Sequence, residues 1–302
     1  MPPSVKTQST SVSKILSFFI DLRSFMLIKA KYHLYRYVLN SINMSYFKSL
    51  FSLENKVAIV TGAARGNGLA ISEALLRSGS TVIMVDVLKE ELKKTEKEFL
   101  SKELSVFSFV ADISKKEEIK KLVKYVKTKF GKLDILINNA GITISDSPLT
   151  YSEKDWDKTF KINLKTPFIL SQECSKIMME KKSGVIINIT SINAEFAFPN
   201  NPAYQATKAG LKQLTKSLAL DLAKFGIRVN SIGPGYFRTS MTKKSWDNLK
   251  RRKEIQECTM LKRWGVPKDL EGIIIFLSSD ASSYITGQDI YVDGGWTAKG
   301  MR

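Results

Sequence analysis

From Lys56 onward, short apolar runs rich in valine and isoleucine alternate with longer segments of helical period. Such runs are apolar throughout, which is typical of parallel strands covered on both faces. The alternation favours an α/β fold, a single doubly wound domain with a seven-stranded parallel sheet between helices. The predicted helices begin near Asn67, Lys89, Lys115, Glu153, Pro202 and Pro267. The predicted strands are residues 57–60, 81–85, 106–110, 135–137, 185–189, 228–231 and 289–292.

One long segment, residues 233–265, interrupts this alternation. It contains Pro234, Gly235, two tryptophans and a cluster of bases, and it follows the end of a predicted strand. Open α/β sheets bind ligands at such strand ends, and long loops inside compact domains are usually functional. We expect residues 44–302 to form one domain in which residues 233–265 are a mobile lid over a substrate. A helical excursion that serves only as cover is the alternative.

Residues 1–43 differ in composition from the rest of the chain. They are rich in serine and carry six lysines and arginines against the single acid Asp21. This basic extension is compatible with a transit peptide, with an interfacial helix over about 14–38, or with translation that begins at Met44. We favour a start at Met44, because the chain then leads directly into the first predicted strand. No membrane span is predicted, since the apolar run at 15–20 is too short.

The formal net charge of +18 over 302 residues suggests nucleic-acid binding only at first sight. Outside the extension, much of this charge lies in stretches such as 89–103 and 114–129, which mix lysine with glutamate as solvated helix faces do. No basic stripe with interleaved aromatic residues is present in the sequence. Nucleic acid is therefore not an expected partner.

The cysteine and histidine content excludes several kinds of site. Cys174 and Cys258 are the only cysteines, which implies no disulfide framework and fits the cytoplasm, unless residues 1–43 direct import into an organelle. The only histidine, His33, lies in the extension. The domain therefore cannot use a histidine base, a Ser-His-Asp triad or a histidine metal ligand, and no metal is expected.

A glycine-rich turn joins the first predicted strand to the first predicted helix. It reads Thr-Gly-Ala-Ala-Arg-Gly-Asn-Gly over residues 61–68. Backbone N–H groups at such a helix start can hold a pyrophosphate, although the spacing differs from the Gly-x-Gly-x-x-Gly of other dinucleotide folds. Taken alone, the turn could be purely structural. The candidate cofactor contacts in it are Gly62, Arg65, Gly66, Asn67 and Gly68.

The second predicted strand ends next to Asp86, 24 residues after Gly62. A carboxylate there can accept both hydroxyls of an adenosine ribose and would repel a 2′-phosphate, which favours NAD over NADP. Arg65 argues the other way, because a guanidinium can pair with that phosphate. The sequence therefore predicts NAD as cofactor and leaves NADP possible.

A tyrosine and a lysine are spaced for proton transfer. Tyr204-Gln-Ala-Thr-Lys208 lies in a segment of helical period, and Tyr204 follows Ser191 by thirteen residues. Side chains four apart on a helix share one face, where an ammonium group can act on a phenol. Ser191, at the end of a predicted strand, can hold a substrate oxygen by a hydrogen bond. Any one of these residues alone is more often structural, but their joint spacing indicates an oxidoreductase site.

These residues together resemble the short-chain dehydrogenase/reductases, specifically the Tyr-x-x-x-Lys group with one Rossmann-like domain. The resemblance covers about residues 52–297. Its marks are the glycine turn, Asp112 after the third strand, Asn138-Asn139-Ala140-Gly141 after the fourth, Asn163, Ser191, Tyr204 with Lys208, and Pro234-Gly235 with Thr239. Asn67 stands where the family usually has isoleucine.

The resemblance implies a role for each of these positions. It assigns proton transfer to Tyr204 with Lys208. It assigns to Asn163 the positioning of a water that links Lys208 to solvent. It also implies a homotetramer or homodimer, formed through helices around 153–180 and 202–225 and through the C-terminal segment. The cofactor contacts that it implies are Asp112 at the adenine edge with the adjacent Ile113, then Asn139, Ala140 and Gly141, then Tyr204 and Lys208, and finally Thr239 at the carboxamide with Pro234 and Gly235.

The closing run from Arg263 to Trp296 resembles the gluconate 5-dehydrogenase-like branch, and related ends occur in 3-oxoacyl-carrier-protein reductases. We therefore expect an NAD(H)-dependent oxidoreductase that acts on a small secondary alcohol or ketone, such as a sugar acid or polyol. The alternatives are an NADPH-dependent 3-oxoacyl-carrier-protein reductase and a non-catalytic dinucleotide-binding scaffold. Some gluconate-type members place a base where this chain has Ser145 and Asp146. Arg238 or the lysines of the lid could take its place.

Overall fold

Seven parallel strands form a single sheet in the order β3-β2-β1-β4-β5-β6-β7. The structure is a computed structural model that describes residues 45–299. The predictions for residues 1–43, including the interfacial helix at 14–38, lie outside this range. The strands are β1 (Val57–Thr61), β2 (Thr81–Asp86), β3 (Val106–Val110), β4 (Ile135–Asn138), β5 (Gly184–Ile189), β6 (Ile227–Pro234) and β7 (Asp289–Val292). All seven predicted strands and the predicted α/β class are confirmed.

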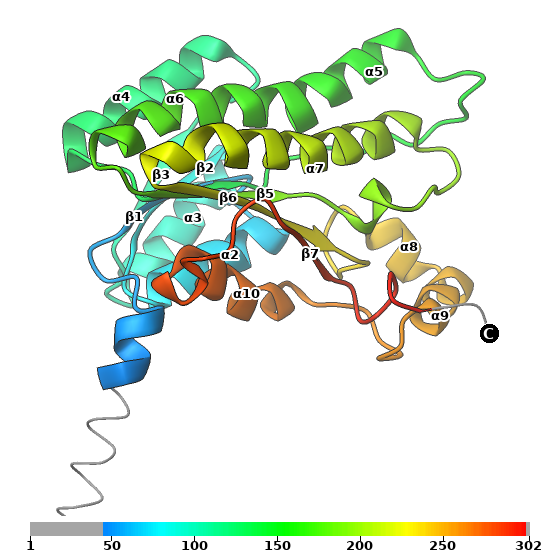
Figure 1. Ribbon diagram of the computed structural model, residues 1–302. Coiled ribbons are helices and arrows are strands. Elements are labelled where there is room, and N and C mark those ends of the chain that lie inside the picture. Colours follow the sequence, from blue (N-terminus) through cyan, green and yellow to red (C-terminus); the bar gives the residue numbers. More distant parts are fainter. Residues whose placement is uncertain (1–44, 300–302) are drawn as a thin grey trace, which may run out of the picture. The chain divides into compact units, whose positions relative to one another are not determined.

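Helices cover both faces of the sheet, so the domain has three layers (Figure 1). On one face, α2 (Gly66–Arg77), α3 (Lys89–Leu100) and α10 (Glu271–Ser278) bury leucines and isoleucines against the sheet. On the other face, α4 (Lys116–Phe130), α6 (Thr166–Glu180) and α7 (Pro202–Leu222) do the same. Alternate residues of β1 enter the two cores, which explains why the strand is apolar at every position before Thr61.

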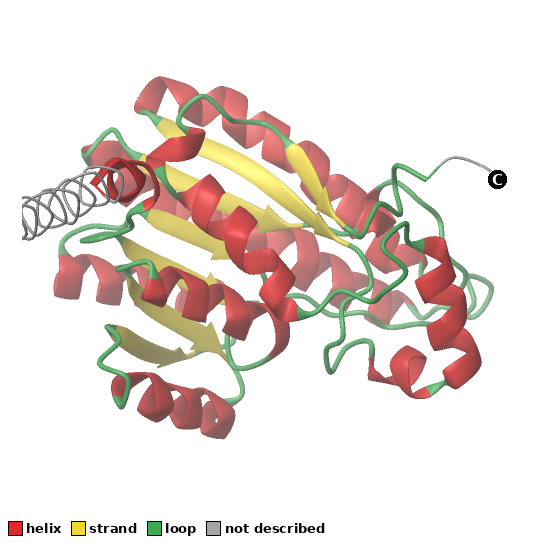
Figure 2. Cartoon of the chain, turned by 90° about the horizontal axis from the view of Figure 1, so that it is seen from below, coloured by secondary structure: helices red, strands yellow, loops and turns green. Residues whose placement is uncertain are grey.

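The strand order reverses between β1 and β4. From β1 the chain moves outward through β2 and β3, and it then returns to the other side of β1 at β4. The arrowheads of the strands all point to the same end of the domain (Figure 2). At that end, the crevice between the outgoing turns of β1 and β4 is where doubly wound sheets bind ligands.

Two local features depart from simple helices and loops. Between α5 (Glu153–Phe160) and α6, residues Lys161–Lys165 form one π-helical turn. The segment predicted as a lid contains two short helices, α8 (Lys243–Asp247) and α9 (Leu249–Cys258). Its mobility stays a prediction. Within residues 45–299, no helix has the combination of length and hydropathy that is needed to cross a bilayer.

Candidate active site

The glycine turn after β1 is shaped so that only glycine fits at three positions. Gly62 and Gly66 have φ of +65° and +59°, a region that other L residues rarely adopt. At Gly68 a Cβ would lie 2.1 Å from the Gly62 carbonyl oxygen and 2.5 Å from Nδ2 of Asn139. The turn is therefore a close-packed loop that brings backbone N–H groups to the start of α2.

Hydrogen bonds hold this turn against the end of β4. The Asn139 side-chain amide donates to the carbonyl oxygens of Thr61 (2.8 Å) and Gly62 (3.2 Å). The Thr61 hydroxyl accepts from the backbone N–H groups of Asn139 and Ala140, each at 3.1 Å. The predicted residues on the two sides of the crevice are thus brought together. Thr61 is a functional position that the sequence did not single out, since threonine at a strand end carries no signal of its own.

The start of α2 has unsatisfied polar groups that suit a bound dinucleotide. Its N-cap residue, Arg65, makes no side-chain capping hydrogen bond, so the first N–H groups of the helix remain available to an anion. Oδ1 of Asn67 is buried and has no hydrogen-bond partner among the described residues. A buried acceptor without a donor costs about 1–3 kcal/mol, which a ligand hydroxyl or amide N–H can offset. The free N–H groups at the helix start therefore fit the pyrophosphate of a dinucleotide, and Oδ1 of Asn67 fits a donor group elsewhere on the same ligand.

Asp86 ends β2 beside the same turn. Its two carboxylate oxygens accept from the backbone N–H groups of Ala64 (3.0 Å) and Leu88 (3.1 Å). An ionised carboxylate has about four acceptor sites, so both oxygens can still accept ribose hydroxyls. Arg65 is exposed and forms no ion pair with any residue of the described part of the chain. Asp86 and Arg65, the two candidate determinants of the choice between NAD and NADP, therefore both lie beside the glycine turn.

The remaining predicted cofactor positions also lie at the carboxyl edge of the sheet. Asp112 follows β3 and accepts from the Ser114 backbone N–H at 3.0 Å; its contacts with Ser114 hold the pKa of this carboxyl below its usual value. Ile113 is almost fully buried. Beyond β6, Gly235 donates from its backbone N–H to the Val292 carbonyl at 3.0 Å, and Thr239 lies against Gly66, where a Cβ would be 3.6 Å from the threonine side chain.

Three side chains form the candidate catalytic group at the ends of β5 and α7. Ser191, two residues beyond β5, is nearly buried, and its hydroxyl donates to Oδ1 of Asn193 at 3.1 Å. Burial raises the pKa of Tyr204 to about 12, and interaction with the Ser191 side chain partly offsets this rise. The Lys208 ammonium lies 5.5 Å from the centre of the Tyr204 ring and donates to the Ile189 carbonyl at 2.6 Å. Burial lowers the pKa of Lys208 to about 8.

Asn163 sits in the π-helical turn and faces the same group. Its amide binds both backbone polar groups of Ile142, at 2.9 and 2.8 Å, and donates to the Thr207 hydroxyl at 3.3 Å. A Cβ on Gly141 would lie 3.3 Å from Oδ1 of Asn163 and 3.7 Å from Nζ of Lys208. The loop after β4, the π turn and α7 therefore meet at one point, next to Lys208.

Comparison with known proteins identifies this arrangement. A family model described as "Enoyl-(Acyl carrier protein) reductase" matches residues 62–297. The chain belongs to the short-chain dehydrogenase/reductase family. Its members bind a nicotinamide cofactor, and this member is an oxidoreductase acting on CH–OH groups.

The individual relatives fall into two groups. The chain is 38% identical to the 3-oxoacyl-[acyl-carrier-protein] reductase of Thermotoga maritima, over 80% of this chain and 98% of the relative. It is 37% identical to the 2-dehydro-3-deoxy-D-gluconate 5-dehydrogenase of Escherichia coli, over 83% and 99%. A solved gluconate 5-dehydrogenase from Burkholderia cenocepacia, in complex with NADP and tartrate, superposes with a TM-score of 0.81 at 31% identity, covering 84% and 99%.

Next to the catalytic group, this short-chain dehydrogenase/reductase carries an aromatic cluster that the sequence showed only in part. Tyr236 stacks on Trp296 with ring centres 5.3 Å apart, and Phe198 contacts both rings at 6.1 and 6.0 Å. The side-chain amide of Gln205, the neighbour of Tyr204, holds Phe198 in place: it accepts from the Phe198 backbone N–H at 3.2 Å and donates to the Phe198 carbonyl at 2.6 Å. Tyr236 had no signal, because a tyrosine in a loop is not distinctive.

Two other kinds of reactive site, a metal centre and a cysteine nucleophile, are not formed by the described residues. Among residues 45–299, no group of three or more histidine, cysteine, aspartate or glutamate side chains is placed to hold a metal ion. Burial raises the pKa of the Cys174 thiol to about 12, so this buried cysteine is not a candidate nucleophile.

Proposed function

We propose that this protein is an NAD(H)-dependent oxidoreductase that interconverts a secondary alcohol and its ketone, with a sugar acid or related hydroxy compound as substrate. The observation that carries the proposal is the group of Ser191, Tyr204 and buried Lys208 at the edge of the crevice that begins at the glycine turn. The relatives named as gluconate-type dehydrogenases support the substrate class.

The chemistry follows from these three side chains. A bound nicotinamide supplies the hydride acceptor or donor. In alcohol oxidation, the Tyr204 oxygen takes the hydroxyl proton, and Ser191 holds the substrate oxygen by a hydrogen bond. A phenol near pKa 12 is a poor acid–base group at neutral pH, so positive charge beside it is needed to lower its pKa. Lys208 lies at the right place to provide that charge, and Asn163 lies next to Lys208, where both side chains approach Gly141.

The choice of NAD rests on the Asp86 carboxylate at the end of β2. A carboxylate beside the ribose accepts its hydroxyls and repels a 2′-phosphate. Fluorescence titration of the purified chain with NADH and NADPH tests this choice, and we expect NADH to bind at least about tenfold more tightly. Replacing Asp86 by serine should narrow the difference, while Arg65→Ser should not. NADPH binding as tight as NADH binding would overturn the assignment.

The runner-up is an NADPH-dependent 3-oxoacyl-carrier-protein reductase. Two observations favour it: relatives with that name are as similar as the dehydrogenases, and the lid is rich in lysine, which suits an acidic carrier protein. Turnover of acetoacetyl thioester with NADPH but not NADH would put this reading first.

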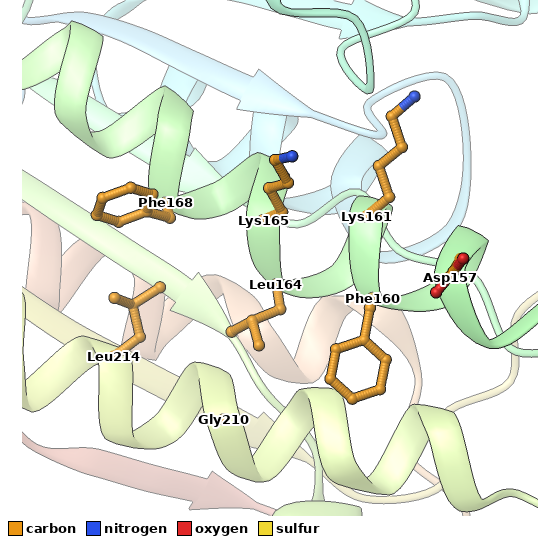
Figure 3. A pocket seen from close by; sticks show the side chains of 8 residues that line it. All are labelled: Asp157, Phe160, Lys161, Leu164, Lys165, Phe168, Gly210 and Leu214. Carbon is orange, nitrogen blue, oxygen red and sulfur yellow. The ribbon is translucent and has the colours of Figure 1, made fainter.

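We also propose that the chain assembles into a homotetramer or homodimer through α5, α6 and α7. An apolar groove of about 690 Å³ lies on this face, and Figure 3 shows Phe160 and Leu164 pointing from the π-turn region toward α7. Phe168 in α6 and Leu220 in α7 are 41% and 80% exposed. Exposed apolar groups on neighbouring helices favour burial against a second copy. Light scattering that reports a monomer at micromolar concentration would refute the assembly.

A further inference from the structure

A buried carboxylate lies in β7, the edge strand of the sheet, outside the group of reacting side chains. The Asp289 side chain is only 4% exposed. Its Oδ1 accepts from the hydroxyls of Thr190 (2.8 Å) and Ser231 (2.6 Å), and its Oδ2 accepts from the hydroxyl of Tyr291 at 2.5 Å. An ionised carboxylate only accepts hydrogen bonds, so this one group orients three hydroxyl protons. The three donors come from β6, from β7 and from the residue directly after β5.

A lysine of α7 joins this carboxylate from the helix side. Lys212 forms an ion pair with Glu195 and lies 3.9 Å from Oδ2 of Asp289. Glu195 also contacts the Tyr291 hydroxyl at 2.9 Å, so that hydroxyl lies between two carboxylates. The Lys212 ammonium offsets part of the repulsion between them. We call this connected set of side chains the Asp289 group; its members are Thr190, Glu195, Lys212, Ser231, Asp289 and Tyr291.

The Asp289 group holds both ends of the loop that carries Ser191. Thr190 directly precedes Ser191, and Glu195 follows it by four residues. Between them, the backbone N–H groups of residues 193–196 donate to Ser191 or Ile192 within one short turn. These local bonds shape the turn but do not attach it to the rest of the domain. The side-chain contacts of Thr190 and Glu195 attach it to β7 and α7.

The same group connects this loop to the helix that carries the other two catalytic side chains. On α7, Lys212 lies one turn beyond Lys208 and two turns beyond Tyr204. The distance of Ser191 from Tyr204 therefore depends on how the loop sits against this helix. A displacement of about 1 Å between reacting groups can cost about 100-fold in rate.

We propose that Asp289 is a positioning residue: it fixes the Ser191 loop against α7, so that the hydroxyls of Ser191 and Tyr204 meet the same substrate oxygen. This inference rests on the proposed function and adds to it a residue outside the reacting groups. A carboxylate suits the task because both of its oxygens accept hydrogen bonds. An amide of the same size would turn an N–H group toward one of the hydroxyls.

Two substitutions in the full chain test this role by kinetics. Asp289→Asn keeps the side-chain volume and removes one acceptor, and Thr190→Val removes one donor with little change of shape. Each should lower kcat about tenfold or more, while the dissociation constant for NADH stays within about twofold. Thr190→Ser keeps the hydroxyl and should recover most of the loss. The probes are D-gluconate with NAD and acetoacetyl-coenzyme A with NADPH.

A background without the Ser191 hydroxyl shows whether the loss passes through that residue. Ser191→Ala leaves Tyr204 and Lys208 in place, and its residual turnover is measured at high protein concentration. In this background, adding Asp289→Asn or Thr190→Val should change kcat by less than about twofold, because the group that they position is already gone. A general weakening of the fold would instead lower kcat by the same factor in both backgrounds.

Amide hydrogen exchange tests the attachment of the loop without any substrate. Exchange in the peptide that contains the Ser191 loop should become about tenfold faster or more in both variants, because the turn then opens more easily. Thr215→Val is the matched control. Thr215 is also fully buried, but its hydroxyl contacts Asn188 and Leu211 and not the Asp289 group. This control should leave loop exchange and kcat within about twofold of the parent.

Three results would overturn the proposal. They are unchanged loop exchange in Asp289→Asn, a loss of kcat that persists in full when Ser191 is replaced by alanine, and equal effects of Thr215→Val on the loop and on kcat. Failure of the proposed function is seen separately, as absence of turnover of either probe by the parent protein. In that case the exchange measurement still decides whether Asp289 holds the loop.

Discussion

Replacing Tyr204 with phenylalanine is expected to lower kcat by about 1000-fold or more in both directions, while the dissociation constant for NADH stays within about twofold. The change removes only a hydroxyl, so the ring keeps its packing on α7 beside Lys208. Without that oxygen no group in the site can exchange the substrate proton, and general acid–base catalysis commonly contributes 10²–10⁴-fold. Steady-state kinetics and fluorescence titration on the same preparation measure the two quantities.

Tyr236→Phe is the matched control for this prediction. Tyr236 packs on Trp264 and Trp296, and it loses the same hydroxyl in the variant. Since the control leaves Ser191, Tyr204 and Lys208 in place, its kcat should fall less than tenfold. Equal losses in the two variants, or a Tyr204→Phe protein with nearly full activity, would show that the proton is carried by another group.

The strands were predictable because their burial follows from a local pattern. In β1 and β5 every residue is buried, so each strand appears in the sequence as a mainly apolar run, which Thr61 ends in β1 and only Asn188 interrupts in β5. The π turn at Lys161–Lys165 was not predictable in the same way. Its period continues that of α5 and α6, and its geometry accompanies the hydrogen bonds of Asn163 with Ile142, a residue 21 positions earlier.

The helices of the lid were expected only under the alternative interpretation, a helical excursion, and for a different reason. α9 has one buried residue, Ile255, and is otherwise dominated by charged side chains, so it lacks the apolar stripe that marks a helix packed on a core. Its position depends on contacts from outside, such as the hydrogen bond from Trp264 to Arg252. Sequence periodicity cannot reveal a helix whose position depends on a contact with a tryptophan from another segment.

The residues of the candidate site likewise fall into those that sequence spacing could place and those that it could not. Ser191, Tyr204 and Lys208 could be placed from spacing, because a strand end and one helix turn fix where they meet. Thr61 and Tyr236 could not, since their importance arises from partners far along the chain: Asn139 for Thr61, and Trp264 and Trp296 for Tyr236. What sequence lacked at this site was the set of long-range contacts that only the folded chain supplies.

Gly68→Ala is expected to destabilise the domain by about 3 kcal/mol and to weaken NADH binding at least about tenfold. Alanine would normally favour a helix by up to about 1 kcal/mol over glycine. Here the new methyl group would lie 2.1 Å from the Gly62 carbonyl oxygen and 2.5 Å from the Asn139 amide, and overpacking of this kind costs about 1–3 kcal/mol or more. The clash is with backbone, which cannot rotate away, so the steric cost exceeds the gain in propensity. Urea unfolding and NADH titration measure both effects.

Gly272→Ala is the matched control, because it makes the same substitution where no steric clash is expected. Gly272 is also near the start of a helix, α10, but a Cβ built there meets no atom of the described chain within 4 Å. The same substitution should therefore leave NADH affinity unchanged and raise stability by up to about 1 kcal/mol. If Gly68→Ala instead behaves like Gly272→Ala, the close approach of α2 to Gly62 and Asn139 is not needed, and the turn does not act as the cofactor cradle. A loss of NADH affinity without a loss of stability would mean that the turn yields to the methyl group and that the cradle alone is deformed.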